Sequence, residues 1–294
     1  MAGWIAVDWG TSTLRATRMP GGETRSSARG MAGLTREMFE PTLLDLIGDW
    51  LDDSDGGTTE VIACGMVGAR QGWVEAPYVP VPAPPLGAAT TRVETRDPRI
   101  ALRIVPGMKQ TAPHPDVMRG EETQIAGILR ERPGFDGVAC LPGTHTKWAH
   151  VSAGEVVSFR TTLTGELFAA LSTATVLRHS LAGDGWVEAA FLAAVSDALS
   201  RPETLAARLF ELRAADLLLG QDAATARSTL SGLLIGAELA ATRPWWLGRE
   251  VVITGSEKTA PAYAAALRAQ GVEPDLLPAD AMTLAGLTAA KELA

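Results

Sequence analysis

The sequence predicts an α/β protein of two similar domains that face each other across a cleft. A four-residue pattern occurs twice, each time after an apolar run typical of a strand. Its copies are Gly10, Thr11, Ser12, Thr13 and Gly143, Thr144, His145, Thr146. The expected strands and helices follow the same order around both copies, and residues 123–128 weakly resemble residues 283–287. Such a repeat indicates a duplicated unit, and ligands commonly bind between domains.

The first half begins with three predicted strands in a meander, over residues 4–7, 14–19 and 23–28. Pro41 then opens an amphipathic helix with apolar residues at helical spacing up to Leu51, and the polar residues 52–57 end it. The remaining elements are two strands and a helix, expected over residues 61–64, 100–105 and 121–131.

The connection over residues 65–99 is expected to be an extended, ordered loop. It is rich in proline, which disfavours a helix. Trp73, Tyr78 and Val79 favour order, and a long ordered loop in a compact domain is usually functional.

The second half is expected to repeat the same order. Its strands are predicted over residues 138–141, 147–151, 156–159, 251–254 and 275–277. Its helices are predicted to start near residue 165 and to cover residues 187–199, 202–212, 223–241, 260–269 and 281–292. Both halves would then have the order β-β-β-α-β-α-β-α.

We place the domain boundary near residue 132. The N-terminal domain would cover residues 1–132, and the C-terminal domain residues 133–280 with a helical insert at about 175–242. The C-terminal helix, 281–294, is expected to pack back on the first domain.

Composition and charge narrow the possible functions. The chain has 294 residues, 46% of them hydrophobic, enough for about two domains without crosslinks. Cys64 and Cys140 lack metal-ligand or redox spacing and are expected to be buried free thiols. No window approaches the ~20 apolar residues of a membrane span, and we expect no leader, which predicts a cytoplasmic protein. The net charge of −8, without clustered cations, predicts no nucleic-acid partner.

The two Gly-Thr turns are candidate phosphate sites. Such a turn exposes successive backbone N–H groups and hydroxyls to an entering phosphate oxygen, although an ordinary hairpin is the alternative. Asp8 before the first turn could hold a hydrated Mg²⁺. The second turn has Leu141 at this place, which disfavours an ATPase that uses two opposed acids. Lys147 and Arg15, just beyond the turns, could meet phosphate charge.

Three other parts of the chain carry candidate residues. Glu121 and Glu122 open a helix, where either could be a general base and either could be an ordinary first-turn acid favoured by the helix dipole. Gly120 beside them allows a ligand to approach the backbone. Gly255 and Ser256 are candidates to lie against adenine or ribose. Arg119 and Arg160 are candidates to bind an anionic group of the substrate.

Seven segments spread over nearly the whole chain resemble the 2-dehydro-3-deoxygalactonokinase family of the actin-like sugar kinase superfamily. They are residues 8–16, 64–68, 76–78, 117–124, 142–148, 160–167 and 230–238. The runs Met-Arg-Gly-Glu-Glu-Thr at 118–123 and Pro-Gly-Thr-His-Thr-Lys-Trp at 142–148 are the most particular. The resemblance implies two ribonuclease-H-like domains, with ATP and Mg²⁺ as cofactors. It also implies transfer of the ATP γ-phosphate to the 6-hydroxyl of 2-dehydro-3-deoxy-D-galactonate, in D-galactonate catabolism.

The resemblance also implies roles for the candidate residues. The two turns would bind phosphate, and Gly255 and Ser256 would lie on the adenosine side. An acid that opens the helix before the second domain would be the base, and we favour Glu121 over Glu122. The substrate pocket would involve Met66, Arg119, Gly120 and Arg160.

Three alternatives stay open at the level of sequence. The chain could phosphorylate a related sugar or sugar acid, such as the C4-epimeric gluconate derivative, or be a catalytically dead sugar-acid sensor. An actin-like chaperone or filament ATPase is disfavoured by Leu141 and the short chain. The oligomeric state is open, with a homodimer as one option.

Overall fold

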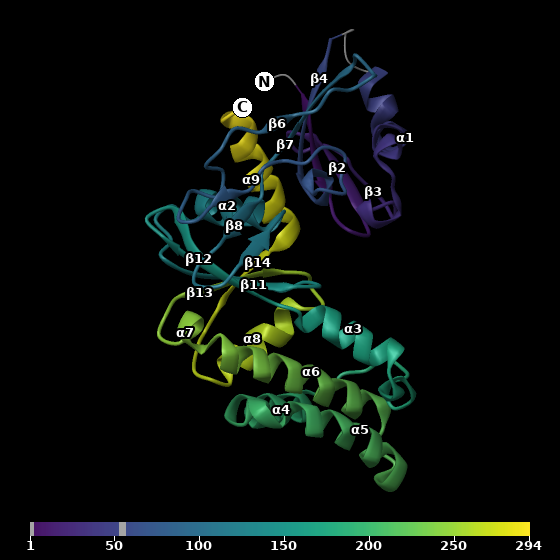
Figure 1. Ribbon diagram of the computed structural model, residues 1–294, viewed down its shortest axis with the longest axis vertical. Helices are drawn as coiled ribbons and strands as arrows, with labels where there is room; N and C mark the ends of the chain where they lie inside the picture. The colour runs from purple at the N-terminus through teal and green to yellow at the C-terminus, as the bar shows by residue number, and fades with distance from the viewer. Residues whose placement is uncertain (1–2, 53–56) are drawn as a thin grey trace. The chain divides into compact units, whose positions relative to one another are not determined.

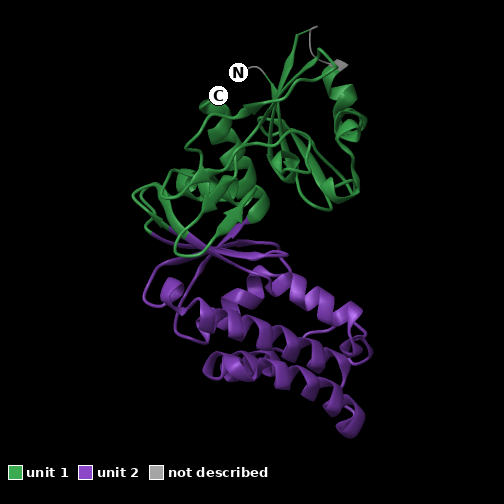
Figure 2. Cartoon of the chain, viewed as in Figure 1, with its two compact units in different colours: residues 1–136, 151–158, 279–294 green, residues 137–150, 159–278 purple. Residues whose placement is uncertain are grey.

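The computed structural model describes residues 3–52 and 57–294, which form two compact units (Figures 1 and 2). The first unit contains the described residues up to Asp136, together with Val151–Ser158 and Ala279–Ala294. The second unit contains Gly137–His150 and Phe159–Pro278. Most of the polar stretch expected to end the first helix, residues 53–56, lies outside the described residues.

The first unit is built on a six-stranded sheet with the order β3-β2-β1-β4-β7-β6. Its strands are β1 (Trp4–Trp9), β2 (Leu14–Met19), β3 (Thr24–Ser27), β4 (Thr59–Gly65), β6 (Thr91–Arg92) and β7 (Ile100–Ile104). β1, β4 and β7 are parallel, whereas β2, β3 and β6 each run antiparallel to a neighbour. The predicted meander and the two later strands are therefore confirmed.

Side chains of β1 point alternately to the two faces of this sheet, and a different helix covers each face. Ile5 and Val7 belong to the core that includes helix α1 (Phe39–Asp52). Trp4 and Ala6 belong to a second cluster with Leu287 of helix α9 (Ala279–Glu292). Successive strand residues point to opposite faces, so Asp8 follows Ala6 on the α9 side. This alternation places a carboxylate at the end of a buried strand, beside the start of α9.

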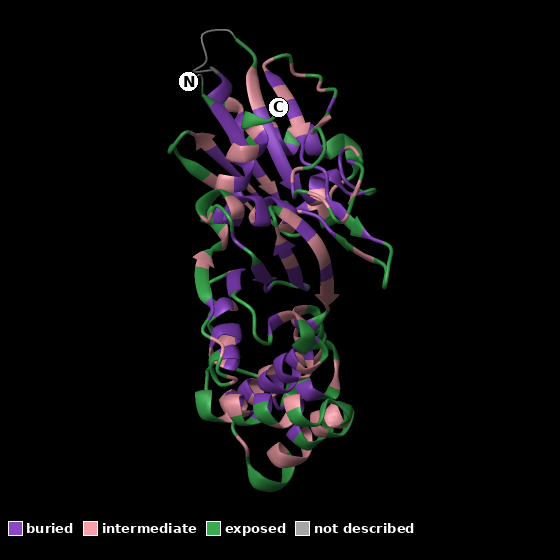
Figure 3. Cartoon of the chain, turned by 90° about the vertical axis from the view of Figure 1, so that its left-hand side faces the viewer, coloured by how far each residue is buried: buried purple, intermediate pink, exposed green. Residues whose placement is uncertain are grey.

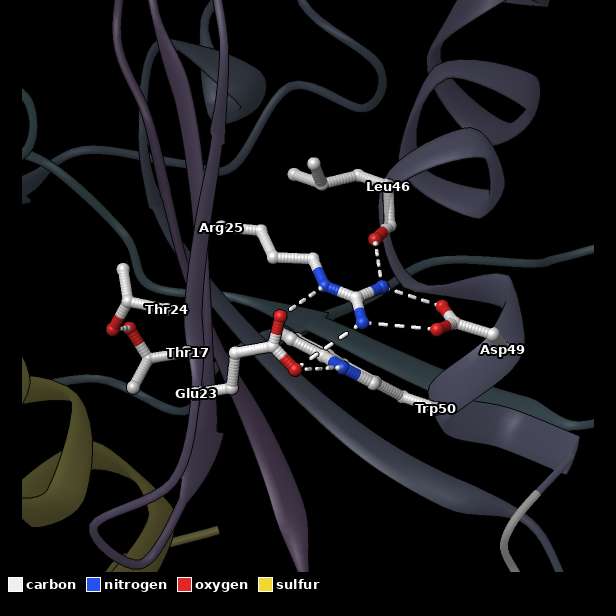
Figure 4. Close-up of polar contacts among 7 residues, drawn as sticks. All are labelled: Thr17, Glu23, Thr24, Arg25, Leu46, Asp49 and Trp50. Carbon is white, nitrogen blue, oxygen red and sulfur yellow. Dashed lines mark hydrogen bonds and ion pairs between the residues drawn. The ribbon is translucent and has the colours of Figure 1, made fainter.

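Arg25 of β3 ties the edge of the sheet to α1 (Figure 4). Its guanidinium donates to the Glu23 carboxylate at 2.8 Å, to the Leu46 carbonyl at 3.1 Å and to Asp49 at 2.9 Å. It also lies over the Trp50 ring, 4.5 Å from the ring centroid. These contacts fix the helix on the strand with polar groups, next to the apolar core.

Helix α2 (Glu121–Glu131) packs closely on α9 through two glycines. A Cβ atom on Gly127 would overlap the Met282 carbonyl, and one on Gly286 would overlap the Thr123 carbonyl. Gln124 of α2 also donates to the Thr283 hydroxyl at 3.3 Å. The weak repeat between residues 123–128 and 283–287 thus lies at a helix crossing where each segment supplies the small residue.

The connection between β4 and β7 differs from the order expected for both halves. In residues 66–99, all of them described, no α-helix lies between these two strands. Instead the described chain forms the 3₁₀ turn η3 (Met66–Gly68) and short strands, with Trp73 buried in the core. A three-stranded sheet that the sequence did not predict has the order β5-β8-β9, from β5 (Val79–Pro80), β8 (Met108–Gln110) and β9 (Asp116–Met118). The expected ordered, non-helical insert is confirmed.

A second sheet, most of it in the second unit, has the order β12-β11-β10-β13-β14, which matches the order β3-β2-β1-β4-β7 within the first sheet. Its strands are β10 (Gly137–Leu141), β11 (Thr146–Ser152), β12 (Glu155–Thr162), β13 (Val251–Gly255) and β14 (Asp275–Pro278). β10, β13 and β14 are parallel, as β1, β4 and β7 are. The duplication inferred from the two Gly-Thr turns therefore extends to strand order and direction.

Helices make up most of the rest of this unit, and buried residues concentrate in β10, β11 and β13 and on the inner sides of the helices (Figure 3). They are α3 (Thr164–Ala174), α4 (Glu188–Ser200), α5 (Leu205–Leu219), α6 (Ala223–Ala241), α7 (Arg243–Trp246) and α8 (Ala260–Arg268). The helix expected over residues 202–212 starts later and continues to Leu219, where Gly220 ends it in the left-handed conformation at φ 66°. The short α7 was not predicted. None of the helices described is long and apolar enough to cross a bilayer.

Candidate active site

The first Gly-Thr turn is held from behind by a neighbouring loop. The Gly10 N–H donates to the Thr13 carbonyl at 2.8 Å, and the Met31 N–H donates to the Gly10 carbonyl at 3.1 Å. A Cβ atom on Gly30 would overlap the Ser12 backbone, so only glycine allows this approach. Thr11, Ser12 and Thr13 remain exposed. The turn thus offers exposed hydroxyls on a closely supported backbone.

Asp8 lies beside this turn in a small cavity of about 100 Å³ that Arg15 and Asp280 also line. Arg15 pairs with Asp8 in the β1–β2 register and forms an ion pair with Asp280 in the first turn of α9. Burial raises the pKa of Asp8; nearby Arg15 opposes this effect, and the charges of Asp280 and Glu121 add to it. A cation bound here would relieve the repulsion among these carboxylates.

The start of α2 holds two glutamates in different environments. Gly120 precedes the helix at φ 106°, and a Cβ atom there would lie 3.3 Å from Gly65 Cα, so the backbones meet closely. Glu121 is partly exposed and accepts the Arg119 N–H at 2.9 Å. Glu122 is fully buried and accepts the Gly120 N–H at 2.7 Å. Burial, and then the charge of Glu121, raise the pKa of Glu122 to about 7.

Arg119 is buried, and among the described residues no carboxylate contacts its side chain. Its Nη2 donates to the Ala76 carbonyl at 2.8 Å, and the guanidinium lies 4.2 Å from the centroid of the Tyr78 ring. Its Nε and Nη1 have no hydrogen-bond partner within the described chain. Gly68 packs against Nη1, and Met66 begins the same η3 turn, half-buried. The loop after β4 therefore surrounds a buried positive charge.

The second Gly-Thr turn lies against the first turn of α3. A Cβ atom on Gly165 would overlap the Gly143 carbonyl, and the Glu166 N–H donates to the Thr144 carbonyl at 2.8 Å. His145 Nε2 and Glu166 Oε2 are 2.6 Å apart. Gly143, Thr144 and His145 are exposed. This turn is thus presented by a helix N-terminus, whose dipole favours anions.

A cavity of about 480 Å³ extends from this turn into the second unit. Its lining includes the aromatic residues Phe168, Trp186 and Tyr263 and the cations Arg227 and Lys258. The predicted Gly255 and Ser256 lie at its edge: Ser256 Oγ is 3.0 Å from the hydroxyl of Thr259, which lines the cavity. Sequence reasoning missed the lining residues on α3, α6 and α8, because apolar positions on a helix look the same whether they face a core or a cavity.

Three predicted residues lie away from this cavity lining. Thr146 is fully buried, with its hydroxyl 2.7 Å from the Tyr263 hydroxyl. Lys147 is buried in β11 and donates to the Thr161 hydroxyl at 2.8 Å. Arg160 is half-buried on β12. The structure therefore brings Asp8 together with the first turn in one unit, and Gly143, Thr144 and the adenosine candidates together in the other.

The described side chains were also compared with the needs of a bound metal ion. Within residues 3–52 and 57–294, no group of three or more His, Cys, Asp or Glu side chains could hold an ion. Cys64 and Cys140 are buried and free, as expected.

Comparisons with known proteins agree over nearly the full length. A family model described as 2-keto-3-deoxy-galactonokinase matches residues 8–290. The probable 2-dehydro-3-deoxygalactonokinase of Rhizobium meliloti (strain 1021) is 39% identical, covering 98% of this chain and 96% of its own. The 2-dehydro-3-deoxygalactonokinase of Escherichia coli (strain K12) is 34% identical, covering 97% of this chain and 96% of its own. A crystal structure from Sinorhizobium meliloti, of a protein assigned the same activity as a candidate, is 38% identical in sequence. It superposes with a TM-score of 0.89 and covers 99% of this chain and 96% of its own.

Proposed function

The chain belongs to the 2-keto-3-deoxy-galactonokinase family, and on this premise we propose that it transfers the γ-phosphate of ATP to the 6-hydroxyl of 2-dehydro-3-deoxy-D-galactonate. It is a kinase that phosphorylates 2-dehydro-3-deoxygalactonate with ATP, in galactonate degradation. Its α/β fold is that of the actin-like ATPases and sugar kinases, with duplicated ribonuclease-H-like units. The proposed products are 2-dehydro-3-deoxy-6-phospho-D-galactonate and ADP.

The 480 Å³ cavity is the observation that carries the nucleotide assignment. Its volume and largely apolar, aromatic lining suit an adenosine group, with Gly255 and Ser256 on that side. The exposed Gly143 and Thr144 in its lining, and His145 next to them in the chain, would receive phosphate oxygens, and Arg227 and Lys258 supply positive charge in an acidic protein. Thr146 and Lys147 would support this turn from the strand behind it.

The first turn and Asp8 would serve the phosphates and Mg²⁺. Asp8 and Asp280 are two carboxylates in one small cavity, and Mg²⁺ typically takes one or two carboxylates and keeps several waters, so the residues fit the ion. When bound, Mg²⁺ neutralises charge on the transferring phosphate. The exposed hydroxyls of Thr11, Ser12 and Thr13 would orient the phosphate oxygens.

Glu121 is the general base in this proposal. It is the partly exposed acid of the pair, whereas the fully buried Glu122 holds the Gly120 N–H. The Glu121 carboxylate would accept the proton of the 6-hydroxyl while that oxygen bonds to the γ-phosphorus. The bond from this phosphorus to the bridging oxygen of ADP breaks in the same step.

Arg119 is the first candidate for the substrate carboxylate. A buried charge normally has an opposite charge beside it, whereas in the described part of the chain the Arg119 side chain contacts a carbonyl and an aromatic ring in place of one. A sugar acid that enters beside Met66 and Gly120 would supply the missing negative charge. Arg160 is the second candidate.

An assay of ADP release with a panel of acceptors tests the function. We expect turnover with 2-dehydro-3-deoxy-D-galactonate, less with its C4 epimer and none with neutral hexoses, and phosphorus NMR should place the phosphate on O6. Preference for another sugar or sugar acid would replace the proposed substrate. Tight binding of the acid without ATP turnover would instead favour a sensor. Cytoplasmic location and the lack of a nucleic-acid partner stay predictions.

A further inference from the structure

A buried carboxylate, Glu238, lies behind the proposed nucleotide cavity. It belongs to α6, in the segment 230–238 that the proposed function leaves without a role, and its exposed fraction is 4%. Three neutral groups donate hydrogen bonds to it. The Trp148 indole N–H donates to Oε1 at 2.7 Å, the Tyr263 hydroxyl donates to Oε2 at 2.8 Å, and the Thr164 hydroxyl donates to Oε2.

These three donors come from three elements around the cavity. Trp148 is on β11, two residues after the second Gly-Thr turn, Thr164 is the first residue of α3, and Tyr263 is on α8. Thr164 and Tyr263 also line the cavity. One carboxylate therefore joins the strand that follows the turn, the helix that packs against it and a wall of the nucleotide cavity.

The carboxylate also sets the direction of a short hydrogen-bond chain. An ionised carboxylate can only accept, so the Tyr263 hydroxyl donates to it. The Tyr263 oxygen then accepts from the Thr146 hydroxyl, 2.7 Å away. The Thr146 hydrogen is thereby directed into the protein, consistent with its complete burial.

We propose that Glu238 is a positioning residue for ATP, acting through Tyr263 and Thr164 on the second Gly-Thr turn. In this arrangement Thr146 anchors the turn through its side chain, and the exposed Gly143 and Thr144 are left to meet the phosphates. The inference rests on the proposed nucleotide site. It adds a residue that touches neither ATP nor the sugar acid.

The surroundings of Glu238 support a role in geometry. Burial raises the pKa of this carboxyl, and hydrogen bonds from Thr164, Trp148 and Tyr263 oppose the rise. Removing a carboxylate from water is costly, and the raised pKa indicates that the three hydrogen bonds offset this cost only in part. The effect of Glu238 is to hold several donors in one arrangement.

The test uses the full chain with Glu238→Gln. The amide would place an N–H against the Trp148 N–H or against the two hydroxyls, which must then turn away and release Thr146. We expect KM for ATP to rise about tenfold, the scale for a lost charged hydrogen bond, while KM for the sugar acid changes less than about twofold. Tyr263→Phe, which keeps the ring but breaks the chain to Thr146, should give part of the same rise.

Glu40→Gln is the matched control. Glu40 is also buried and accepts two backbone N–H groups, from Arg96 and Asp97, at 2.7 Å, but it lies in the first unit. We expect it to lower thermal stability and to leave KM for ATP unchanged. An E40Q variant that raises KM for ATP as much as E238Q would overturn the proposal, because any buried carboxylate would then have the same effect.

Other outcomes decide between the inference and the function on which it rests. If E238Q and Y263F both keep the KM of the wild type for ATP, the inference is wrong and the proposed kinase stands. If E238Q does not fold, Y263F and Thr164→Ala, which each remove one donor, decide: a selective rise in KM for ATP supports the inference, and unchanged values overturn it. A wild type that neither binds nor uses ATP overturns the proposed function and the inference with it.

Discussion

Adjacent residues at the start of α2 differ in what they can reach. Glu121 is partly exposed, and Glu122 is fully buried against the Gly120 N–H and the Thr123 hydroxyl. The helix makes this difference, because neighbouring positions on a helix point about a quarter-turn apart. One glutamate can therefore contact a substrate while the other fixes the backbone beneath it.

The first prediction concerns the base. Glu121→Gln should lower kcat by at least about a hundredfold, because an amide cannot accept the hydroxyl proton, and should leave nucleotide affinity unchanged. Steady-state kinetics and titration with an ATP analogue measure the two quantities. Glu131→Gln, at the exposed far end of the same helix, is the control. Near-normal turnover in E121Q would exclude Glu121 as the base.

The second prediction concerns Glu122 and pH. Its pKa is about 7 in the folded protein and near 4.5 in an unfolded chain. Stability from this group is therefore fully present below pH 4.5 and is lost as pH rises through 7, by up to about 3 kcal/mol. Glu122→Gln stays neutral, so its free energy of unfolding should rise relative to the wild type from pH 5 to 8. Urea unfolding at four pH values would measure this difference in free energy of unfolding. If the free energies of the two proteins change in parallel with pH, the prediction is wrong.

Among the elements, close backbone approaches control how the turns are presented. Gly30 lets a loop lie directly on the first turn, and Gly165 lets α3 begin directly on the second. Both turns are thus supported by a glycine from elsewhere in the chain. Neither supporting glycine can be identified from the Gly-Thr pattern itself.

The third prediction tests this support in the second unit. Gly165→Ala places a Cβ atom on the Gly143 carbonyl, so the helix and the turn must separate. We expect KM for ATP to rise at least about tenfold and stability to fall by about 1–3 kcal/mol. Kinetics and thermal unfolding check both. Gly48→Ala in α1, where a Cβ atom meets open space, should instead raise stability by up to about 1 kcal/mol and leave KM unchanged.

The strands and turns could be predicted because their signals are local. Apolar runs followed by Gly-Thr located β1, β10 and both turns, and helix α6 has the predicted bounds. The small sheet β5-β8-β9 was missed because strands of two or three residues have no measurable alternation. The C-terminal half of α5 was missed because Leu217, Leu218 and Leu219 are exposed, so the helix lacks a polar outer face there. The cavity residues required knowledge of packing.

At the scale of the whole molecule, the C-terminal helix α9 belongs to the first unit, although the chain has passed through the second unit before it. Leu287 and Ala290 of α9 are buried with Trp4, Ala6 and Ile62. Ion pairs of α9 with Arg15, Glu60 and Arg130 surround this contact. The first unit therefore needs Ala279–Ala294, a segment from the opposite end of the chain.

The fourth prediction follows from this return. A chain ending at residue 278 should lose the cooperative unfolding of the first unit, because its sheet keeps an uncovered apolar face. Limited proteolysis with mass spectrometry should show rapid cleavage within residues 1–136. A chain ending at residue 292 removes only exposed residues and should behave as the full protein does. If the shorter chain resists protease equally well, α9 is dispensable for the first unit.

The return of α9 also bears on how the protein is made. During synthesis, Trp4, Ala6 and Ile62 leave the ribosome long before the helix that covers them, and all of the second unit is translated in between. Domains usually fold as they emerge, the N-terminal one first. Here the second unit, which has its own core, should fold before the first is complete. The nascent chain would therefore present an apolar sheet face to chaperones for most of its translation.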